Sequence, residues 1–471
     1  LLLRLNKRRH RYPPGPRPLP IIGNLHQLPR RDPWRTLKTW HDRHGPIITV
    51  WMGSRPMIII GSFHCAKELF KRRGAIYGSR PAYFADAMGS DSLAVALPYG
   101  LQWRRHRLLL YALLNKRRCK DYLSLQVLEC KQLLWELLST DDFAGRFHRF
   151  TASLTFALAY GRRLERGDEP EVKEIDRIMR ELLGEVCLPG VAFPILDHLP
   201  DWLAPWRRSA ARLQDSQARF FTHHMLRAIQ TTETKTWSQT IRDLACARWP
   251  ESVFSENEMA HVIGVNYEAG SDTTAFVLEV FILVAVLQRP AVLRAQAELD
   301  ELVGSQRMPT LDDMPRLSYL RAFVEEVLRW RPVVPGGLHH CTTQDDKYMG
   351  YRIRRGTTVI QNHWSLEFDE EVFQDPHSFL PERWIENPDL PICAFGMGRR
   401  LCPGEHLARN SLNLVISRML WAFHIQYVGD EPPDPFAMTQ GISSRPQPFK
   451  AEFRPRSPSR RTLIETEWKN A

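Results

Sequence analysis

One glycine-rich run near the carboxyl terminus limits the local fold more than any other part of this 471-residue chain. Residues 395–404 read FGMGRRLCPG, in which Gly398 and Gly404 leave the backbone free to turn tightly. Pro403 and the helical spacing of apolar residues after it predict that a helix begins there. Cys402 is therefore expected at a helix N-terminus, where free amides and the helix dipole stabilise an anionic sulfur.

The same ten residues fit the pattern F-x-x-G-x-R-x-C-x-G. This pattern resembles the haem-ligand loop of the cytochrome P450 family. The resemblance implies that Cys402 is the axial ligand of a haem b iron. It also implies that Phe395, Arg400 and Gly404 contact this cofactor. A thiolate ligand donates electron density to the iron and favours cleavage of the O–O bond.

Two other interpretations of Cys402 remain open. A lone cysteine in a turn is usually a buried and inert thiol. A zinc site is the second alternative, because Cys393 and His406 are close to Cys402 in the sequence. Zinc sites favour two pairs of closely spaced ligands, and the sequence offers no second pair.

The longest predicted helix covers residues 255–287. Ser255 and Glu258 predict a capping box at its start, and its apolar run ends before Pro290. The run is apolar on all sides and contains Glu279. These features predict a buried core helix and not a membrane span.

The middle of this helix reads AGSDTT at residues 269–274, where a glycine and two threonines weaken the helix and free backbone groups for water. The segment resembles the oxygen-activation motif A-G-x-D-T-T of the same family. The resemblance implies that Thr273 positions the water of a proton relay and that Asp272 links the relay to solvent. A packing kink, in which Ser and Thr bond their own backbone, is the alternative.

Glu326 and Arg329 are three residues apart on one predicted helix, so their side chains can pair. They match the family motif E-x-x-R, and the PERW segment at 381–384 resembles the family motif P-E-R-F. The resemblance implies that Arg383 joins Glu326 and Arg329 in a buried structural network. This network is expected to stabilise the haem-ligand loop.

Trp103 and Arg107 are four residues apart on one helical face, which by itself predicts only a solvated basic helix. The resemblance implies that both donate hydrogen bonds to the haem propionates, as do Arg400 and His340. His340 departs from the family pattern, because His339 stands where the family usually has proline.

Composition narrows the class of protein further. Eight cysteines without paired spacing favour a reducing environment that faces the cytosol. The net charge of +11 suits an acidic protein partner, anionic lipid or nucleic acid. No nucleic-acid motif accompanies this charge, so we expect a protein partner and a membrane, and no nucleic acid.

The chain begins with LLLRL, a basic cluster and the proline-rich segment at 13–20. This order is typical of the cytosolic end of a membrane anchor, so residues 1–12 are interpreted as the remnant of an anchor and its basic stop. The family motifs occur in order across the chain and predict one catalytic domain at 13–455. Residues 456–471 are expected to form an exposed basic tail.

The predicted fold is mainly α with a small β subdomain. Apolar β-prone segments predict strands at 47–52 and 57–60, and around 348–353 and 357–360. By resemblance this is a single-domain cytochrome P450-like fold, with haem between the long central helix and the Cys402 loop.

Several segments fall where the family lines its substrate pocket, and most of their residues are apolar, which favours a lipophilic substrate. They are residues 81–89, Val265, Asn266, residues 333–338 and Ile442. The proline-rich start and the motifs resemble fungal microsomal members, including some that act on polyketide-type metabolites.

The resemblance thus implies a haem-thiolate monooxygenase that inserts one oxygen atom of O2 into a lipophilic small molecule, by hydroxylation or epoxidation. It implies electrons from a separate NADPH–cytochrome P450 reductase, with cytochrome b5 as an optional second donor. It also implies an endoplasmic reticulum membrane location, with the catalytic domain facing the cytosol. The alternatives are a haem-thiolate isomerase or dehydratase that needs no O2, which the Asp272-Thr273 pair argues against, and a non-enzymatic haem-binding protein.

Overall fold

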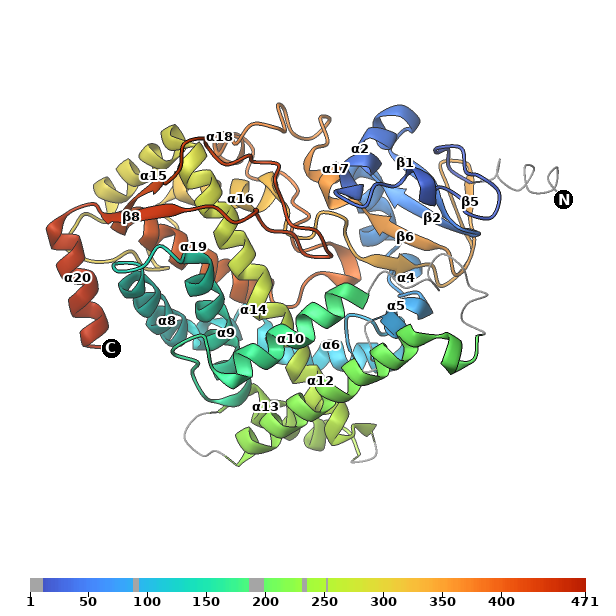
Figure 1. The fold of residues 1–471 in the computed structure, drawn as a ribbon, viewed down its shortest axis with the longest axis horizontal. Helices are drawn as coiled ribbons and strands as arrows, with labels where there is room; N and C mark the ends of the chain where they lie inside the picture. The colour runs from blue at the N-terminus through green and yellow to red at the C-terminus, as the bar shows by residue number, and fades with distance from the viewer. Residues whose placement is uncertain (1–11, 88–92, 186–198, 231–234, 251–252) are drawn as a thin grey trace.

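A computed structural model describes residues 12–87, 93–185, 199–230, 235–250 and 253–471. Its fold is mainly α, with α14 running through the middle of the molecule and a small sheet at the end where the described chain begins (Figure 1). This agrees with the predicted fold class.

The helices divide into those before and those after the 186–198 segment. The first set is α2 (Pro33–His44), α3 (Phe63–Ala66), α4 (Gly74–Tyr77), α5 (Ala82–Ala87), α6 (Leu101–Leu114), α7 (Arg118–Asp121), α8 (Leu123–Glu136), α9 (Phe143–Tyr160) and α10 (Pro170–Glu185). The second set is α12 (Pro205–Ile229), α13 (Trp237–Arg248), α14 (Glu256–Leu287), α15 (Arg289–Leu302), α16 (Ser318–Trp330), α17 (His363–Glu367), α18 (Glu382–Glu386), α19 (Glu405–Ala422) and α20 (Pro458–Lys469).

The largest described sheet has the strand order β1-β2-β6-β3. Its strands are β1 (Ile47–Met52), β2 (Arg55–Ile60), β6 (Thr358–Gln361) and β3 (His339–Cys341). β2 and β6 are parallel, whereas β1 pairs with β2 and β3 pairs with β6 in antiparallel registers. Because His340 lies opposite Val359 in this register, the sheet fixes the position of a predicted site residue.

Two further described sheets are two-stranded ribbons. They are β4 (Asp346–Tyr348) with β5 (Tyr351–Ile353), and β7 (Phe423–Tyr427) with β8 (Ala451–Pro455). The predicted strands at 47–52, 57–60, 348–353 and 357–360 are thereby confirmed, with β2 beginning two residues earlier than expected.

α14 has 32 residues, which corresponds to about 48 Å of helix. Ser255 is its N-cap and accepts a hydrogen bond from the Glu258 amide at 3.1 Å. The predicted capping box is only half formed, because the Glu258 carboxylate instead contacts His106 at 2.7 Å and Gln102 at 3.0 Å. These contacts join α6 to the start of α14. The Glu258 carboxylate thus binds residues of α6 instead of the backbone amide of Ser255.

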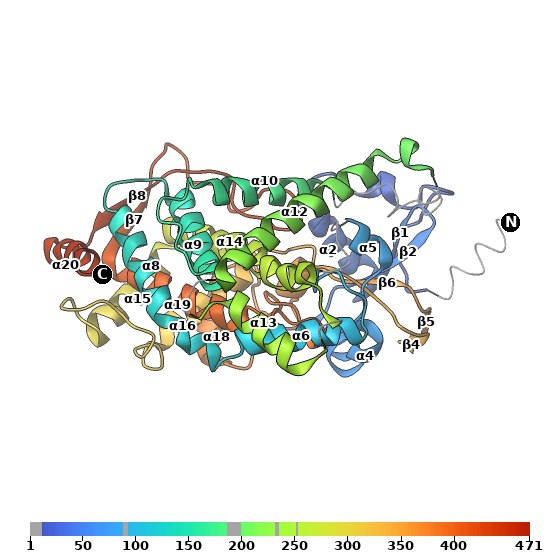
Figure 2. The same cartoon turned by 90° about the horizontal axis from the view of Figure 1, so that it is seen from below.

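α14 is also the one helix in the described part of the chain that is long and apolar enough to cross a membrane. Its most apolar window is 61% buried inside the protein. α9 and α12 pack on one side of it and α19 packs on another (Figure 2). The prediction of a buried core helix is confirmed.

The prediction of an exposed basic tail at 456–471 is wrong. Residues of this segment form α20, which packs on α8 at the edge of the molecule opposite the β1-β2-β6-β3 sheet (Figures 1 and 2). Ile464 is fully buried, and Trp468 stacks on Trp135 with a centroid distance of 5.8 Å. Arg456 and Arg460 both pair with Asp300 of α15 at 2.5 Å. These cations bind carboxylates of the domain instead of solvent, which the basic composition alone could not reveal.

Candidate active site

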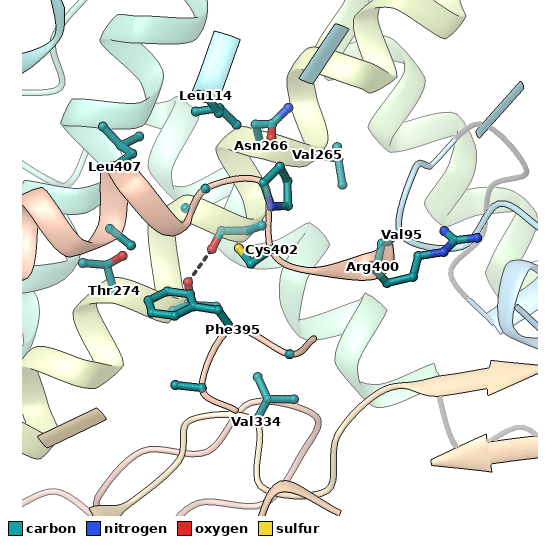
Figure 3. A pocket seen from close by; sticks show the side chains of 18 of the residues that line it. Val95, Leu114, Val265, Asn266, Thr274, Val334, Phe395, Arg400, Cys402 and Leu407 are labelled. Carbon is teal, nitrogen blue, oxygen red and sulfur yellow. Dashed lines mark hydrogen bonds between the residues drawn. The ribbon is translucent and has the colours of Figure 1, made fainter. Parts of the chain in front are cut away.

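A cavity of about 340 Å³ lies between α14 and the loop that precedes α19. Figure 3 shows Cys402 in this loop, with Val265 and Asn266 of α14 on one side of it and Phe395 and Val334 on another. The cavity brings together eight of the predicted site residues: Trp103, Arg107, Thr273, His340, Phe395, Arg400, Cys402 and Gly404.

The conformation of the Cys402 loop depends on a glycine with positive φ near its start and on the helix α19 that follows it. Gly398 has φ +70°, and a Cβ there would meet the Phe70 carbonyl oxygen at 1.9 Å, so only glycine fits. The Cys402 amide donates to the Phe395 carbonyl at 2.9 Å. Gly404 is the N-cap of α19, so Cys402 stands just before the helix N-terminus as predicted.

The surroundings of the Cys402 thiol affect its pKa in opposite directions. Burial raises its pKa, whereas the backbone amides of Gly404 and Glu405 and the positive charge of Arg107 act to lower it. A buried sulfur of this kind becomes a stable anion when a cation binds to it directly. The site therefore suits a metal ligand better than a free thiolate.

Three guanidinium groups line the same cavity, at Arg80, Arg107 and Arg400. Burial and the charges of Arg80 and Arg107 lower the pKa of Arg400 to about 8, and burial lowers the pKa of Arg80 to about 9. Within the described residues, none of the three has a carboxylate within ion-pair distance. Arg400 instead donates to backbone carbonyls, among them Gly78 at 2.8 Å, and lies 4.4 Å from the Trp103 ring centroid.

Arg80 is the residue that the sequence interpretation missed. It directly precedes Pro81, the first residue of the 81–89 segment that the sequence predicts to line the substrate pocket. An arginine at the edge of an otherwise apolar pocket segment is the signal that could have singled it out. Its burial at 5% exposure without a carboxylate partner marks it as part of the cationic group.

His340 lies on β3, and its Nδ1 contacts the Tyr77 carbonyl at 3.1 Å. Burial and the charges of Arg80 and Arg400 hold its pKa well below the ordinary value. A neutral imidazole with Nδ1–H bonded to a carbonyl leaves Nε2 as an acceptor, so His340 suits a neutral neighbour better than an anionic one. This agrees with its departure from the family pattern.

The 269–274 segment keeps α14 helical without a break. The Thr273 hydroxyl faces the cavity and donates to the Ala269 carbonyl at 2.8 Å, which is the backbone contact expected of a packing kink. Asp272 does not line the cavity, and it pairs with His148 of α9 at 3.1 Å. Thr273 therefore lines the cavity, whereas Asp272, the preceding residue on the helix, contacts α9 outside it.

The structure brings Glu326, Arg329 and Arg383 into one buried network. Arg329 donates to both oxygens of Glu326, at 2.7 and 2.9 Å, and Arg383 donates to it at 3.3 Å. Arg329 also binds the Glu367 carbonyl at 2.8 Å, and the Glu367 carboxylate accepts the Cys393 amide at 2.7 Å. The network thus reaches the segment that leads into the Cys402 loop.

The zinc alternative finds no support in the described residues, where no group of three or more His, Cys, Asp or Glu side chains is arranged to hold a metal ion. Cys393 is fully buried, with its thiol near the His363 carbonyl. The two cysteines proposed as zinc ligands are therefore in different environments.

The pocket-lining prediction is confirmed in part. Five of its residues line the cavity: Val265, Asn266, Val333, Val334 and Leu338. Ile442 and residues 81–84 do not line it, and the side chains of residues 85–89 lie outside the described part of the chain. The mainly apolar wall agrees with the expectation of a lipophilic ligand.

The residues around the cavity fit the haem that the resemblance implies. The Cys402 sulfur offers a ligand for iron on one wall. Arg80 is buried and Arg107 and Arg400 are half-buried, so the cavity holds positive charge that two propionates would compensate. Such a cavity in a mainly α fold is what a haem-dependent oxidoreductase requires.

Comparisons with known proteins agree with a haem-binding function for this cavity. Residues 13–453 match the family described as Cytochrome P450. Similar proteins include cytochrome P450 monooxygenase FrzL of Cladobotryum sp, which is 42% identical over 98% of this chain and 91% of its own length. Cytochrome P450 monooxygenase aneD of Aspergillus aculeatus is 41% identical over the same shares, and peniB of Penicillium patulum is 38% identical over 100% and 90%.

The chain therefore belongs to the cytochrome P450 family. Its fungal relatives are monooxygenases, and it is an oxidoreductase of the same kind. The family implies a haem cofactor with a cysteine ligand, a redox partner, a lipophilic substrate and O2.

Proposed function

We propose that this cytochrome P450 inserts one oxygen atom of O2 into a lipophilic small molecule, with Cys402 as the axial ligand of haem b. The balanced reaction consumes R–H, O2, two electrons and two protons, and it yields R–OH and water. When bound, the haem supplies the iron centre at which O2 is activated. The observation that supports this most directly is the position of Cys402 across one cavity from Thr273.

The chain's own residues divide the work of holding the cofactor. Trp103, Arg107 and Arg400 would bind the propionates, because they combine N–H donors with positive charge in one part of the cavity. His340 lines the same cavity and would contact the cofactor there as a neutral imidazole, without adding a cation for the propionates. Phe395 and Gly404 flank Cys402 and would contact the macrocycle beside the ligand.

Thr273 and Asp272 would deliver protons. Thr273 lines the cavity, and its hydroxyl would accept a hydrogen bond from a water there while it donates to the Ala269 carbonyl; Asp272, the preceding residue, does not line the cavity. Apolar residues around the rest of the cavity would exclude bulk water, so protons would arrive only by this route.

Electrons would come from a separate NADPH–cytochrome P450 reductase, with cytochrome b5 as an optional second donor. The net charge of +11 supports an acidic protein partner and an anionic membrane surface. We extend the proposal to the endoplasmic reticulum membrane, with the catalytic domain in the cytosol. Hydroxylation and epoxidation are both compatible with an apolar cavity.

A carbon monoxide difference spectrum of the reduced holoprotein tests the ligand. We expect the Soret band that is characteristic of thiolate ligation, and we expect Cys402→Ser to abolish it. Cys246→Ser is the matched control, because Cys246 is exposed on α13. Absence of the band from the unaltered protein would overturn the proposal. O2 uptake driven by NADPH and reductase then separates a monooxygenase from an isomerase or dehydratase.

A further inference from the structure

The imidazole of His148 connects three helices through one nitrogen. Its Nε2 lies 3.1 Å from Oδ1 of Asp272 on α14 and 3.3 Å from Oδ1 of Asp176 on α10. His148 itself belongs to α9. The three side chains form a row in which the exposed fraction falls from 42% for Asp176 through 23% for His148 to 16% for Asp272. The row therefore leads from solvent to the proposed proton-relay residue.

The two carboxylates that contact His148 change the pKa of its imidazole. Burial disfavours a charged His148, but hydrogen bonding and charge interaction with Asp176 and Asp272 outweigh it and raise the pKa of His148 to about 10. The two carboxylates thus favour the imidazolium form of His148. Across the described chain, no other Lys, Arg or His lies within ion-pair distance of Asp272. The neighbouring acid on the same helix, Glu279, is paired with Arg445.

Asp176 lies on α10, and α10 is separated from the central helix α14 by α12. α10 packs on α12, and α12 packs on α14 (Figure 2). The contact from Asp176 to His148 is therefore a direct polar link between α10 and the layer beneath it. If α10 moved outward, Asp176 would leave His148, whereas Asp272 on the rigid central helix would stay in place.

We propose that His148 is a positioning residue that holds the Asp272 carboxylate and connects it to solvent, and that its contact with Asp176 makes this connection depend on the position of α10. The inference rests on the proposed role of Asp272 and Thr273 in proton delivery. It goes further by naming the residue through which protons reach Asp272 and the helix that controls this access.

Hydrogen–deuterium exchange of the holoprotein tests the structural half. We expect His148→Ala and Asp176→Asn each to increase exchange of the 170–185 peptide at least twofold, because α10 loses its link to α9 and α14. Arg177→Ala is the matched control on the same helix, since it removes only the partly exposed pairs with Glu174 and Glu181. Unchanged exchange in both variants would overturn the coupling to α10.

The share of electrons that is released as peroxide tests the role of His148 in proton delivery. With NADPH and reductase, we expect His148→Ala to keep the carbon monoxide spectrum but to raise the share of electrons released as peroxide several-fold and to enlarge the solvent isotope effect on O2 uptake. Asp176→Asn should change both in the same direction but less. Wild-type partition in His148→Ala would overturn the proposal, even if α10 exchange rose.

Two further variants separate this inference from the proposed function. If Asp272→Asn and Thr273→Ala increase peroxide while His148→Ala does not, only the role of His148 is wrong. If all three variants retain wild-type partition, the proton relay itself is wrong.

Discussion

The guanidinium of Arg400 lies 4.4 Å from the ring centroid of Trp103, so the Cys402 loop and α6 meet at the edge of the cavity. Arg107, one turn after Trp103 on α6, and Arg80 complete a group of buried and half-buried cations around the cavity. Their mutual repulsion is a cost of the fold that a dianionic ligand would remove. We therefore expect these residues to stabilise the protein when a dianionic cofactor is bound and to destabilise it when the cofactor is absent.

Arg400→Ala should weaken haem retention by about tenfold or more, because a charge-assisted hydrogen bond contributes on the order of 1.5–3 kcal/mol. Transfer of haem to an excess of apomyoglobin measures this. Arg104→Ala is the control, since Arg104 is an exposed cation on α6, the helix that carries Trp103 and Arg107. Equal transfer rates for the two variants would contradict the assignment of Arg400 to the propionates.

Glu326→Gln should lower the free energy of unfolding by about 3–5 kcal/mol, because it leaves the Arg329 and Arg383 charges buried without their carboxylate. Urea unfolding followed by fluorescence checks this. Glu382→Gln breaks an exposed pair with Arg294 in the same region and should cost less than about 1 kcal/mol. Similar losses for both variants would mean that the network is not structural.

Glu268→Gln should change how stability depends on pH. Burial raises the pKa of Glu268 from 4.5 to about 7, partly opposed by a hydrogen bond from Gln217. The folded protein thus keeps a proton that the unfolded chain releases, so stability should fall as pH rises from about 4.5 to 7 and then stay level. The variant should avoid this fall and gain up to about 3 kcal/mol relative to the wild type at pH 8.

Urea unfolding at pH 5, 6, 7 and 8 measures this difference for Glu268→Gln. Glu256→Gln, an exposed exchange in the first turn of the same helix, is the reference. Parallel stability curves for wild type and Glu268→Gln would show that the Glu268 carboxyl releases its proton in the folded protein as readily as in the unfolded chain.

Thr273→Ala should leave haem bound but divert reducing equivalents to peroxide, because the hydroxyl that holds the relay water is lost. Peroxide formed per NADPH consumed is the measurement. Ser271→Ala is the control, since the Ser271 hydroxyl donates to the Glu268 carbonyl and does not line the cavity. Normal coupling in the Thr273 variant would remove it from the relay.

Ile464→Ala should destabilise the protein by about 2–5 kcal/mol if α20 is an integral part of the domain. Ile464 is fully buried against the domain, whereas Thr462 on the same helix is exposed. Thermal unfolding of Ile464→Ala and Thr462→Ala measures the difference. An Ile464 variant as stable as the Thr462 variant would support the original expectation of a loose tail.

Local patterns predicted those parts of the site that depend on a few neighbouring residues. Spacing alone placed Cys402 before a helix and placed Glu326 and Arg329 on one helical face, because glycine, proline and helical periodicity act over a few residues. The boundaries of α14 followed in the same way from Ser255 and Pro290. In each case the relevant partner is close in the sequence.

Long-range partners could not be predicted in this way. Glu258 bonds His106 instead of its own N-cap, and the basic residues Arg456 and Arg460 bind Asp300 of a distant helix. Arg80 and His148 belong to no local motif, yet each lies beside a predicted site residue. A side chain chooses among available partners by distance and burial, and only the folded chain sets these.

The sequence by itself determined that Cys402 stands in a glycine-rich turn before a helix, and that a buried helix carries Asp272 and Thr273. Only the tertiary structure decided that Thr273 lines the same cavity as Cys402 while Asp272 contacts His148 of α9 outside that cavity. Adjacent residues on a helix point about 100° apart, so the neighbours around the helix decide which of them meets the cavity. Those neighbours come from α9, α10 and the Cys402 loop, which are far apart in the chain.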